Sequence, residues 1–352
     1  MASVRNVLGS VLQRFRRLDC SHRRPVYAQR MMKEHSMEKV ILGNSDIGVA
    51  PLVFGGNVFG WTLDEKQSFN MLDACVDRGI NMLDSADVYS AWVDGNQGGE
   101  SEAVIGRWLA QSGKRDQVVI ATKVGMPMPN GGSGLSRKHI LKSADDSLRR
   151  LQADCIDVYY AHQDDPETPF EETLGAFQEL IDAGKVRAIA SSNYSAERLA
   201  EMLKFARANG LPEFIAHQPQ YNLFDRGDYE GALEAVCKEF DLGVLTYFSL
   251  ASGFLTGKYH SREDLQQSGR GAAFLEKYLN PRGLRILEAL KEVSQLHQVP
   301  EAAIALAWIL HRPGITGPIA SATSTKQLDQ LILAASLELP PEDMERLNSA
   351  GD

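Results

Sequence analysis

Four polar side chains in the first half of the sequence stand at, or shortly after, the ends of short apolar segments. They are Asp84, Tyr89, Lys123 and His162. A charged group at the rim of a buried segment costs free energy unless a partner of opposite charge lies close to it. Asp84 and Lys123 can form such a pair. The four residues therefore predict one polar site assembled from distant parts of the chain.

The residue types in this set favour proton donation. An ammonium group beside a phenol favours the phenolate, so we expect Lys123 to lower the pKa of Tyr89 from its usual value near ~10. His162 is expected to orient a substrate oxygen or to assist the proton transfer. The set holds no good nucleophile and no metal cage. It therefore favours a reaction that develops an alkoxide, such as hydride addition to a carbonyl, over acyl transfer.

These side chains need a scaffold that brings them to one edge. Short apolar segments alternate with stretches of helical period, which predicts repeated βα units on a parallel sheet. The predicted strands are 52–55, 81–84, 118–123, 157–162, 186–191, 214–218, 243–247 and 317–321. Eight units favour a single (β/α)8 TIM barrel, in which the carboxyl ends of the strands carry the chemistry. A Rossmann fold is disfavoured because no G-x-G-x-x-G follows an early strand.

Other local patterns refine this barrel. Segments 39–42 and 46–49 flank Gly43-Asn44-Ser45 and predict a hairpin that closes the bottom of the barrel. Segment 251–281 is predicted to be a long loop after the seventh strand. Gly79 and Gly184 are expected just past helix ends, where a positive φ suits glycine. The predicted helix N-caps are Ser136, Ser195 and Thr325.

Composition excludes several classes of protein. The 352-residue chain is 43% hydrophobic, 24% charged and has a formal net charge of -9, which argues against nucleic acid or an anionic membrane as its main partner. No run of about 18 apolar residues predicts a transmembrane helix. The four cysteines are widely spaced and predict neither a disulfide framework nor a zinc module. We expect a cytoplasmic protein.

The amino terminus differs from the rest of the chain. Residues 1–36 carry eight basic and two acidic residues and no secretory core. They are predicted to be a disordered extension, either upstream of an internal start at Met37 or acting as a transit peptide. Residues 37–352 are predicted to form the barrel domain.

Several motifs then resemble the aldo-keto reductases in type and in order. They are MEKVILGNSDIGVAPLVFGGNVF from Met37, NMLDSADVY from Asn81, GESE from Gly99, GAFQELIDAGKVRAIASSN from Gly175, QPQYNLFDR from Gln218 and YFSLASGFLTGKY from Tyr247. The resemblance covers about residues 37 to 350 and includes the branch with the potassium-channel beta subunits. It implies a (β/α)8 reductase that uses NADPH to reduce a small aldehyde or ketone. Its catalytic tetrad would be Asp84, Tyr89, Lys123 and His162, with the tyrosine as general acid.

The resemblance also implies three groups of cofactor contacts. The group at the nicotinamide is Gly56, Asn57, Ser192, Asn193, Gln218 and Tyr247. The loop over the pyrophosphate, whose amides and single cation suit phosphate, is Ser249, Leu250, Ala251, Gly253 and Lys258. The residues at the adenosine end are Thr323, Gln327 and Gln330.

Two departures from the family pattern concern the cofactor. Where the family usually has Ser-Pro-Leu after the stacking aromatic residue, this chain has Phe248-Ser249-Leu250, so we expect a different loop path. Many members carry Lys or Arg near the adenosine 2′-phosphate, whereas this chain has Ser321, Thr323 and Gln327, with Lys326 as the nearest cation. Because Lys and Arg are the strong phosphate partners, NADH stays open beside NADPH.

Two other functions stay open at this point. A slow-turnover nucleotide-binding redox sensor would resemble the potassium-channel beta subunits, which lack a histidine at the position of His162. A metal-dependent TIM-barrel hydrolase would use His162 with Asp164 and Asp165. However, predicted strands five, six and eight end in Ser, Gln and Ser rather than in metal ligands, so we expect no resident metal.

Two features outside the tetrad also carry an interpretation. Phe59, Trp61 and Trp92 are expected either to line an apolar substrate pocket or to pack its rim. Arg149 and Arg150 are expected on a solvated helix surface. The substrate itself and the oligomeric state are not predicted.

Overall fold

The computed structural model describes residues 37–129, 131–265 and 275–352. The predicted extension at 1–36 and positions 266–274 of the predicted loop lie outside the described residues. The remaining part of that loop follows the seventh barrel strand and contains a 3₁₀ helix, η3 (Ala251–Thr256), and the short helix α8 (Arg262–Leu265).

Eight parallel strands form a closed barrel in the order β10-β3-β4-β5-β6-β7-β8-β9. They are β3 (Val53–Gly55), β4 (Met82–Asp84), β5 (Val119–Val124), β6 (Ile156–Ala161), β7 (Val186–Ser192), β8 (Ala216–Gln218), β9 (Gly243–Thr246) and β10 (Ile315–Ala320). Each begins and ends within two residues of its predicted bounds. The (β/α)8 barrel expected from the alternating pattern is thus confirmed.

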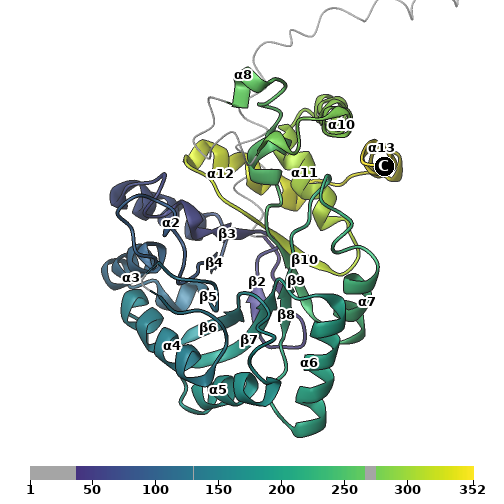
Figure 1. Ribbon diagram of the computed structural model, residues 1–352. Coiled ribbons are helices and arrows are strands. Elements are labelled where there is room, and N and C mark those ends of the chain that lie inside the picture. The colour runs from purple at the N-terminus through teal and green to yellow at the C-terminus, as the bar shows by residue number, and fades with distance from the viewer. Residues whose placement is uncertain (1–36, 130, 266–274) are drawn as a thin grey trace, which may run out of the picture. The chain divides into compact units, whose positions relative to one another are not determined.

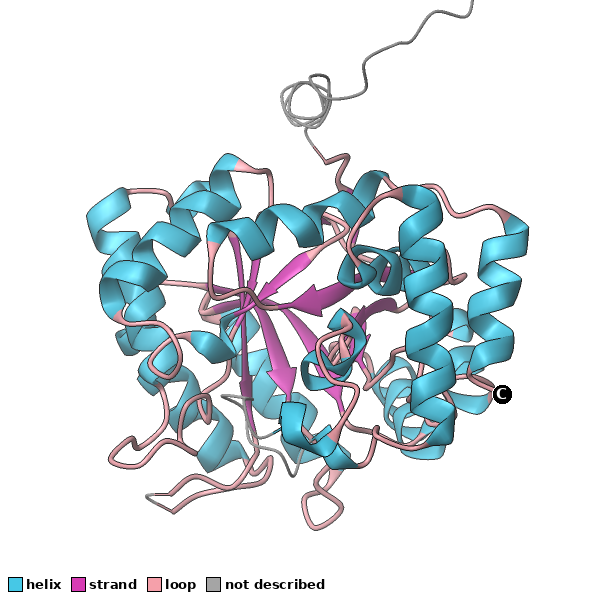
Figure 2. Cartoon of the chain, turned by 90° about the horizontal axis from the view of Figure 1, so that it is seen from above, coloured by secondary structure: helices cyan, strands magenta, loops and turns pink. Residues whose placement is uncertain are grey.

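Helices surround the strands, as Figures 1 and 2 show. They are α2 (Glu65–Asp77), α3 (Glu100–Ser112), α4 (Arg137–Leu151), α5 (Phe170–Asp182), α6 (Ala196–Asn209), α7 (Ala232–Glu239), α10 (Pro281–His297), α11 (Glu301–Leu310), α12 (Thr325–Ile332) and α13 (Pro341–Ala350). The 3₁₀ segments besides η3 are η1 (Gly56–Val58), η2 (Arg115–Gln117) and η4 (Leu333–Ser336). Helix and outward strand side chains form one apolar layer, and a smaller cluster fills the barrel interior.

The helix ends follow the capping rules, with one correction. Ser136 and Ser195 accept hydrogen bonds from backbone N–H groups three residues ahead and cap α4 and α6, as predicted. The prediction of Thr325 as an N-cap is wrong. Ser324 caps α12, because its Oγ accepts from the N–H of Gln327, and Thr325 is the first helical residue.

The amino-terminal hairpin closes the bottom of the barrel. Strands β1 (Val40–Ile41) and β2 (Gly48–Val49) pair antiparallel, and the turn between them begins at Gly43. Leu42 and Ile47 are fully buried among inward-facing strand residues. The predicted hairpin plug is therefore present, and its apolar side chains seal the end opposite to the carboxyl ends of the strands.

At Gly43 the hairpin backbone packs closely against the barrel backbone, so we expect Gly43→Ala to destabilise the fold. Its φ is +55°, and a Cβ there would lie 2.0 Å from the carbonyl oxygen of Ile215. Left-handed strain and overpacking together predict a loss of about 2 kcal/mol or more, measured by urea unfolding. Gly113→Ala is the matched control, because Gly113 has a φ of +66° and open space around it. Equal losses in the two variants would contradict a tightly packed plug.

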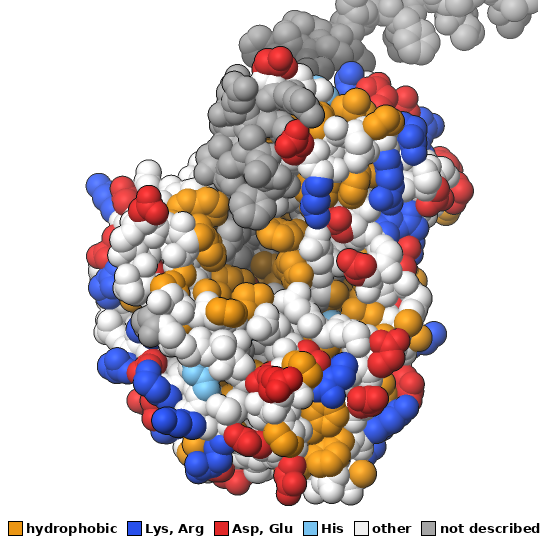
Figure 3. All heavy atoms as spheres, in the orientation of Figure 1, with side chains coloured by type: hydrophobic (Ala, Val, Ile, Leu, Met, Phe, Trp, Pro, Cys, Tyr) orange, Lys and Arg blue, Asp and Glu red, His pale blue; other side chains and the backbone are white. Residues whose placement is uncertain are grey.

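The surface carries charges of both signs. Acidic and basic side chains are interspersed over the face that Figure 3 presents. In the part of the chain that the structure describes, the helices are too short or too polar to cross a membrane.

Candidate active site

The predicted tetrad gathers at one end of the barrel, where the strands finish; we call this end the mouth. Asp84 is the last residue of β4, Lys123 the second-last of β5, and His162 follows β6 directly. Tyr89 lies in the segment after β4. Asp84 and Lys123 pair with neighbouring strands through their backbones, and their side chains are 1% and 0% exposed. The barrel register thus brings together residues from three consecutive strands and one loop.

All three N–H donors of the Lys123 ammonium group have hydrogen-bond acceptors. Its Nζ donates to Asp84 Oδ2 at 2.7 Å, to Tyr89 Oη at 2.8 Å and to the carbonyl oxygen of Ser85 at 2.8 Å. An ammonium has three N–H donors, so each one has an acceptor. Gln218 Nε2 donates to the other Asp84 oxygen at 2.9 Å. The expected Asp84–Lys123 pair is present, and both partners are held rigidly.

The phenol of Tyr89 sits between this pair and the opening. Its oxygen accepts from Lys123 and donates to Asp84 Oδ2 at 3.0 Å. Burial and the Asp84 carboxylate raise the pKa of Tyr89 well above its usual value. The prediction of a lowered Tyr89 pKa is therefore wrong, because burial, together with the carboxylate that contacts the same oxygen, outweighs the effect of the ammonium. Tyr89 keeps its proton at neutral pH and releases it only to a stronger base.

His162 is an uncharged hydrogen-bonding group at the mouth. Burial and the Lys123 charge hold its pKa well below the usual value, so the ring is neutral. Its Nδ1 is buried without a hydrogen-bond partner in the described part of the chain. The ring centroids of His162 and Tyr89 are 6.2 Å apart. An imidazole placed in this way can orient an oxygen that also approaches the phenol.

The residues expected at the nicotinamide are joined to the tetrad by hydrogen bonds. Asn193 Nδ2 donates to the His162 carbonyl oxygen at 2.8 Å, and its Oδ1 accepts from Tyr247 Oη at 2.7 Å. Ser192 Oγ donates to the carbonyl oxygen of Gln218 at 2.8 Å. Ser192, Asn193, Gln218 and Tyr247 thus form one polar wall beside the tetrad.

The first βα loop completes this wall. Gly56 and Asn57 lie in η1, directly after β3. A Cβ on Gly56 would lie 2.9 Å from the Asp84 carbonyl oxygen, so only glycine allows this close approach. Asn57 Oδ1 accepts from Ser321 Oγ at 2.6 Å. The structure therefore places Gly56 against the tetrad, and Asn57 contacts Ser321, which directly follows β10.

The predicted pyrophosphate loop has an unusual backbone. Phe248, Ala251 and Ser252 have positive φ angles of 51°, 48° and 56°, and Gly253 has 99°. Such left-handed turns can aim backbone amides at an anion. The Ser249 hydroxyl is buried and donates to the Thr246 carbonyl oxygen at 2.8 Å, so its hydrogen is already engaged within the protein. Leu250 is half-buried, Ala251 is buried and Lys258 is exposed.

The residues expected at the adenosine end lie at and near the start of α12. Thr323 donates to Gln327 Oε1 through its backbone N–H at 2.8 Å and through Oγ1 at 3.0 Å. Gln330 is half-buried in the same helix. The partly exposed Tyr247 ring, the left-handed loop and this helix start suit the ring, the phosphates and the far end of a dinucleotide. The residues present therefore fit a nicotinamide dinucleotide.

Two tryptophans extend an aromatic surface outward from Tyr89. The ring centroids of Tyr89 and Trp92 are 6.1 Å apart, and those of Trp92 and Trp61 are 5.6 Å apart, both edge-on. Trp92 is 49% exposed. A large exposed aromatic side chain beside a polar site is typical of a surface that contacts an apolar part of a substrate.

The carboxylates of the metal-hydrolase alternative have other partners. Asp164 accepts from Arg198 Nε at 2.8 Å and Nη2 at 3.0 Å, and Asp165 Oδ2 accepts from the Leu135 N–H at 2.7 Å. Within 37–129, 131–265 and 275–352, no three His, Cys, Asp or Glu side chains are grouped as metal ligands.

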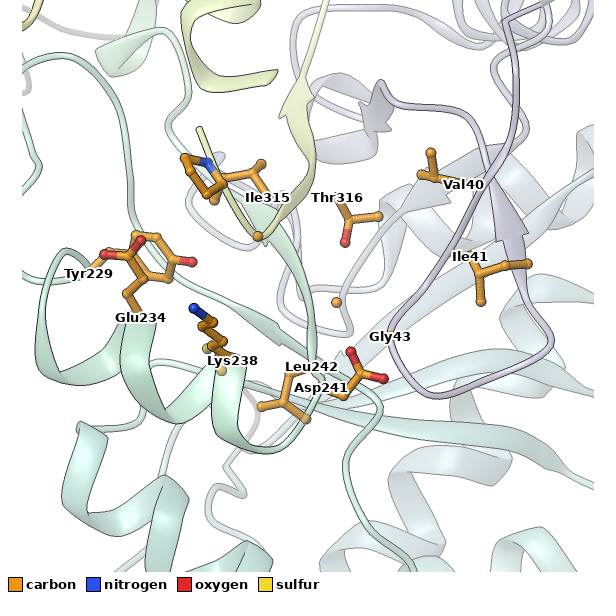
Figure 4. A pocket seen from close by; sticks show the side chains of 14 residues that line it. Val40, Ile41, Gly43, Tyr229, Glu234, Lys238, Asp241, Leu242, Ile315 and Thr316 are labelled. Carbon is orange, nitrogen blue, oxygen red and sulfur yellow. The ribbon is translucent and has the colours of Figure 1, made fainter. Parts of the chain in front are cut away.

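A separate cavity of about 450 Å³ lies at the opposite end of the barrel (Figure 4). It is lined by the amino-terminal hairpin, by α7 and by the starts of β9 and β10. Its labelled side chains include Tyr229, Glu234 and Lys238. Because the tetrad lies at the carboxyl ends of the strands, this cavity takes no part in its chemistry.

Sequence reasoning missed a buried ion pair behind the tetrad. Arg150 Nε donates to Glu102 Oε2 at 2.6 Å, and Glu102 is 0% exposed. The interpretation of Arg150 as solvated surface is therefore wrong, whereas Arg149 is exposed and pairs with Asp146. No local sequence pattern marks this pair. In the structure the Arg150 side chain passes close to Gly99, where a Cβ would lie 2.5 Å from it.

Comparisons with known proteins find similar proteins over most of the chain. The family model described as the aldo/keto reductase family matches residues 51–352. An uncharacterized oxidoreductase, YrpG of Bacillus subtilis (strain 168), is 34% identical over 319 residues, covering 89% of this chain and 95% of that protein. A probable voltage-gated potassium channel subunit beta of Oryza sativa subsp. japonica is 35% identical over 321 residues, covering 88% and 94%. Aldo-keto reductase YhdN of Bacillus subtilis (strain 168) is 33% identical over 316 residues, covering 87% and 89%.

Proposed function

Because this chain belongs to the aldo/keto reductase family, we propose that it reduces an aldehyde or ketone to an alcohol with NAD(P)H, using Tyr89 as the proton donor. The observation that carries the proposal is the 2.8 Å contact between Lys123 Nζ and Tyr89 Oη at the mouth. A phenol that is held by a buried ammonium beside a neutral imidazole suits protonation of an alkoxide. The same set offers no nucleophile for acyl transfer.

The chain's own residues have distinct parts in this reaction. The nicotinamide, when bound, supplies a hydride to the carbonyl carbon. The neutral His162 ring donates a hydrogen bond to the carbonyl oxygen and so fixes its direction. As negative charge grows on that oxygen, Tyr89 Oη gives up its proton to it, because an alkoxide is a stronger base than even a raised-pKa phenolate. Lys123 then stabilises the phenolate that remains.

One small movement is required before the proton transfer. In the free protein the Tyr89 hydroxyl donates to Asp84, so its hydrogen points away from a substrate. Rotation about the C–O bond turns the hydrogen toward the mouth. The oxygen stays in place during this rotation, because Lys123 continues to donate to it. Asp84 keeps the ammonium charged and aimed at the phenol.

We favour NADPH over NADH from the family resemblance, with NADH as the alternative. Thr323 and Gln327 bond each other at the adenosine end, and Lys326 is exposed beside them. A cation that is free to turn toward a 2′-phosphate supports NADPH, but a single exposed lysine gives a modest preference.

A panel of carbonyl compounds with NADPH and NADH, side by side, tests the proposal through loss of nicotinamide absorbance. Multiple turnovers with at least one carbonyl, unaffected by a chelator, would support the reductase. Tight nucleotide binding with no more than one turnover would overturn it in favour of a redox sensor. That second candidate is favoured by the 35% identity to a probable potassium channel subunit beta.

A further inference from the structure

Behind Lys123, on the outer side of the barrel wall, lies a group of polar side chains that the proposed mechanism does not use. We call it the rear cluster; its members are Asp87, Glu102, Thr122, Arg150 and Tyr159. Asp87 is 2% exposed, and Glu102, Thr122 and Tyr159 are 0% exposed. They come from the Tyr89 loop, α3, β5, α4 and β6, and α3 and α4 pack against each other.

The rear cluster touches the catalytic segment through the backbone. The N–H of Asp87 donates to the carbonyl oxygen of Lys123 at 3.2 Å. Asp87 is also three residues after Asp84 and two before Tyr89. Any change in the Asp87 side chain therefore acts on the loop that carries the phenol and on the strand that carries the ammonium.

The charges of the rear cluster do not balance if both carboxyl groups ionise. Arg150 pairs with Glu102, whose second oxygen accepts from Thr122 Oγ1 at 2.6 Å. This leaves Asp87, which makes no ion pair within the described residues and whose Oδ1 is buried without a partner there. A buried carboxylate without a counterion is costly, so Asp87 is stable only when it keeps its proton.

The surrounding groups support the same protonation state. Burial, and then the Glu102 carboxylate, raise the pKa of Asp87 to about 8, against the opposing charge of Arg150, a hydrogen bond from the Val88 N–H and the charge of Lys123. The Tyr159 hydroxyl on β6 is also buried and unpartnered in the described chain. Burial raises the pKa of Tyr159 well above its usual value, so this phenol supplies no charge.

We propose that Asp87 is a positioning residue for the reductase reaction, holding a neutral carboxyl group behind Lys123, and that loss of its proton slows proton transfer from Tyr89. The proposal rests on the reductase function proposed above. An added negative charge at Asp87 opposes formation of the Tyr89 phenolate and draws the Lys123 ammonium toward the rear cluster. Asp87 touches neither substrate nor cofactor in this scheme, so its effect is carried by Lys123 and the loop.

The pH profile of carbonyl reduction tests this role. In the wild type we expect the turnover rate to fall at least threefold between pH 7 and pH 9.5, below the range in which Tyr89 itself ionises. Asp87→Asn keeps a neutral side chain of the same shape, so its rate should fall less than that of the wild type over this range. The fall that remains belongs to Lys123, whose pKa is lowered by burial. Asp94→Asn, an exposed carboxyl in the same loop, is the control and should keep the wild-type fall. An unchanged fall in Asp87→Asn would overturn the proposal.

Thermal unfolding gives a readout that needs no activity. The folded chain keeps the Asp87 proton up to about pH 8, whereas the unfolded chain loses it near the ordinary value of 3.8. The folded state therefore binds more protons across this window, and its stability falls as pH rises through it. We expect the melting temperature of Asp87→Asn to rise relative to wild type between pH 4 and 8 and to level off above. A difference in melting temperature that does not change with pH would refute the neutral carboxyl group at Asp87. If the melting temperatures behave as expected but the wild type reduces no carbonyl, the reductase function and the kinetic role of Asp87 would both be refuted.

Discussion

In the Tyr89→Phe variant we expect the rate of carbonyl reduction to fall by about 10²-fold or more, the usual contribution of a general acid. The phenylalanine ring keeps the contacts of the tyrosine ring with Trp92 and with the Lys123 ammonium, which lies 4.6 Å from the ring centroid. Only the hydroxyl is lost. Asp84 and Lys123 remain in contact at 2.7 Å without it, so the buried pair and the fold persist.

The measurement separates chemistry from binding. Single-turnover reduction reports the chemical step, and titration of nucleotide fluorescence reports cofactor affinity. We expect the affinity to stay nearly unchanged, because Tyr247 and Asn193 bond each other and not Tyr89. Tyr229→Phe, at the opposite end of the barrel, is the matched loss of a hydroxyl and should be active. Near wild-type turnover in Tyr89→Phe would remove this residue from the mechanism.

The barrel was predictable because its strands carry a strong local signal. Strands buried on both faces read as apolar runs, as in Val119-Ile120-Ala121, which opens a strand whose residues are all buried. Glycine stops and serine caps marked the helix ends for the same reason, since they satisfy backbone groups locally. Thr325 was misplaced by one residue because Ser324 has an equivalent hydroxyl, and only the backbone path decides which one faces the Gln327 N–H.

The candidate site was predictable as a set of residues but not as an electrostatic system. The types and positions of Asp84 and Lys123 at strand ends indicated a pair, which the structure shows. The direction of the Tyr89 pKa depends on which charge touches the phenol oxygen and on how far water is excluded, and both depend on three-dimensional packing. A pattern of residue types shows neither which charge contacts the phenol oxygen nor how far water is excluded.

The sequence also did not predict contacts that depend on the direction in which a side chain points. Ser249 is in the segment expected over the pyrophosphate, and its hydroxyl donates to the Thr246 carbonyl oxygen, a direction that the residue type does not indicate. The adjacent residues Arg149 and Arg150 were both expected at the helix surface. In the structure, the lack of a side chain at Gly99 leaves room for Arg150 to reach Glu102. Arg150 and Glu102 are 48 residues apart in the sequence, so no local pattern encodes their relative placement.

Lys123→Met is expected to impair both activity and stability. The methionine has a similar length but leaves the Asp84 carboxylate buried at 1% exposure without its counterion. Breaking one side of a buried ion pair costs about 3–5 kcal/mol, which we expect as a lower denaturant midpoint in urea unfolding. Loss of the charge that stabilises the Tyr89 phenolate should lower the reduction rate by about 10²–10³-fold.

A second variant separates these two effects. In Asp84→Asn/Lys123→Met no buried charge is left unpaired, and the amide can still accept from Gln218 Nε2. Most of the lost stability should therefore return, because the penalty in the single variant comes from the stranded carboxylate. The reduction rate should stay low, since no ammonium faces the phenol. Recovery of activity together with stability would show that Lys123 serves the fold alone, and the proton-transfer scheme would then have to be abandoned.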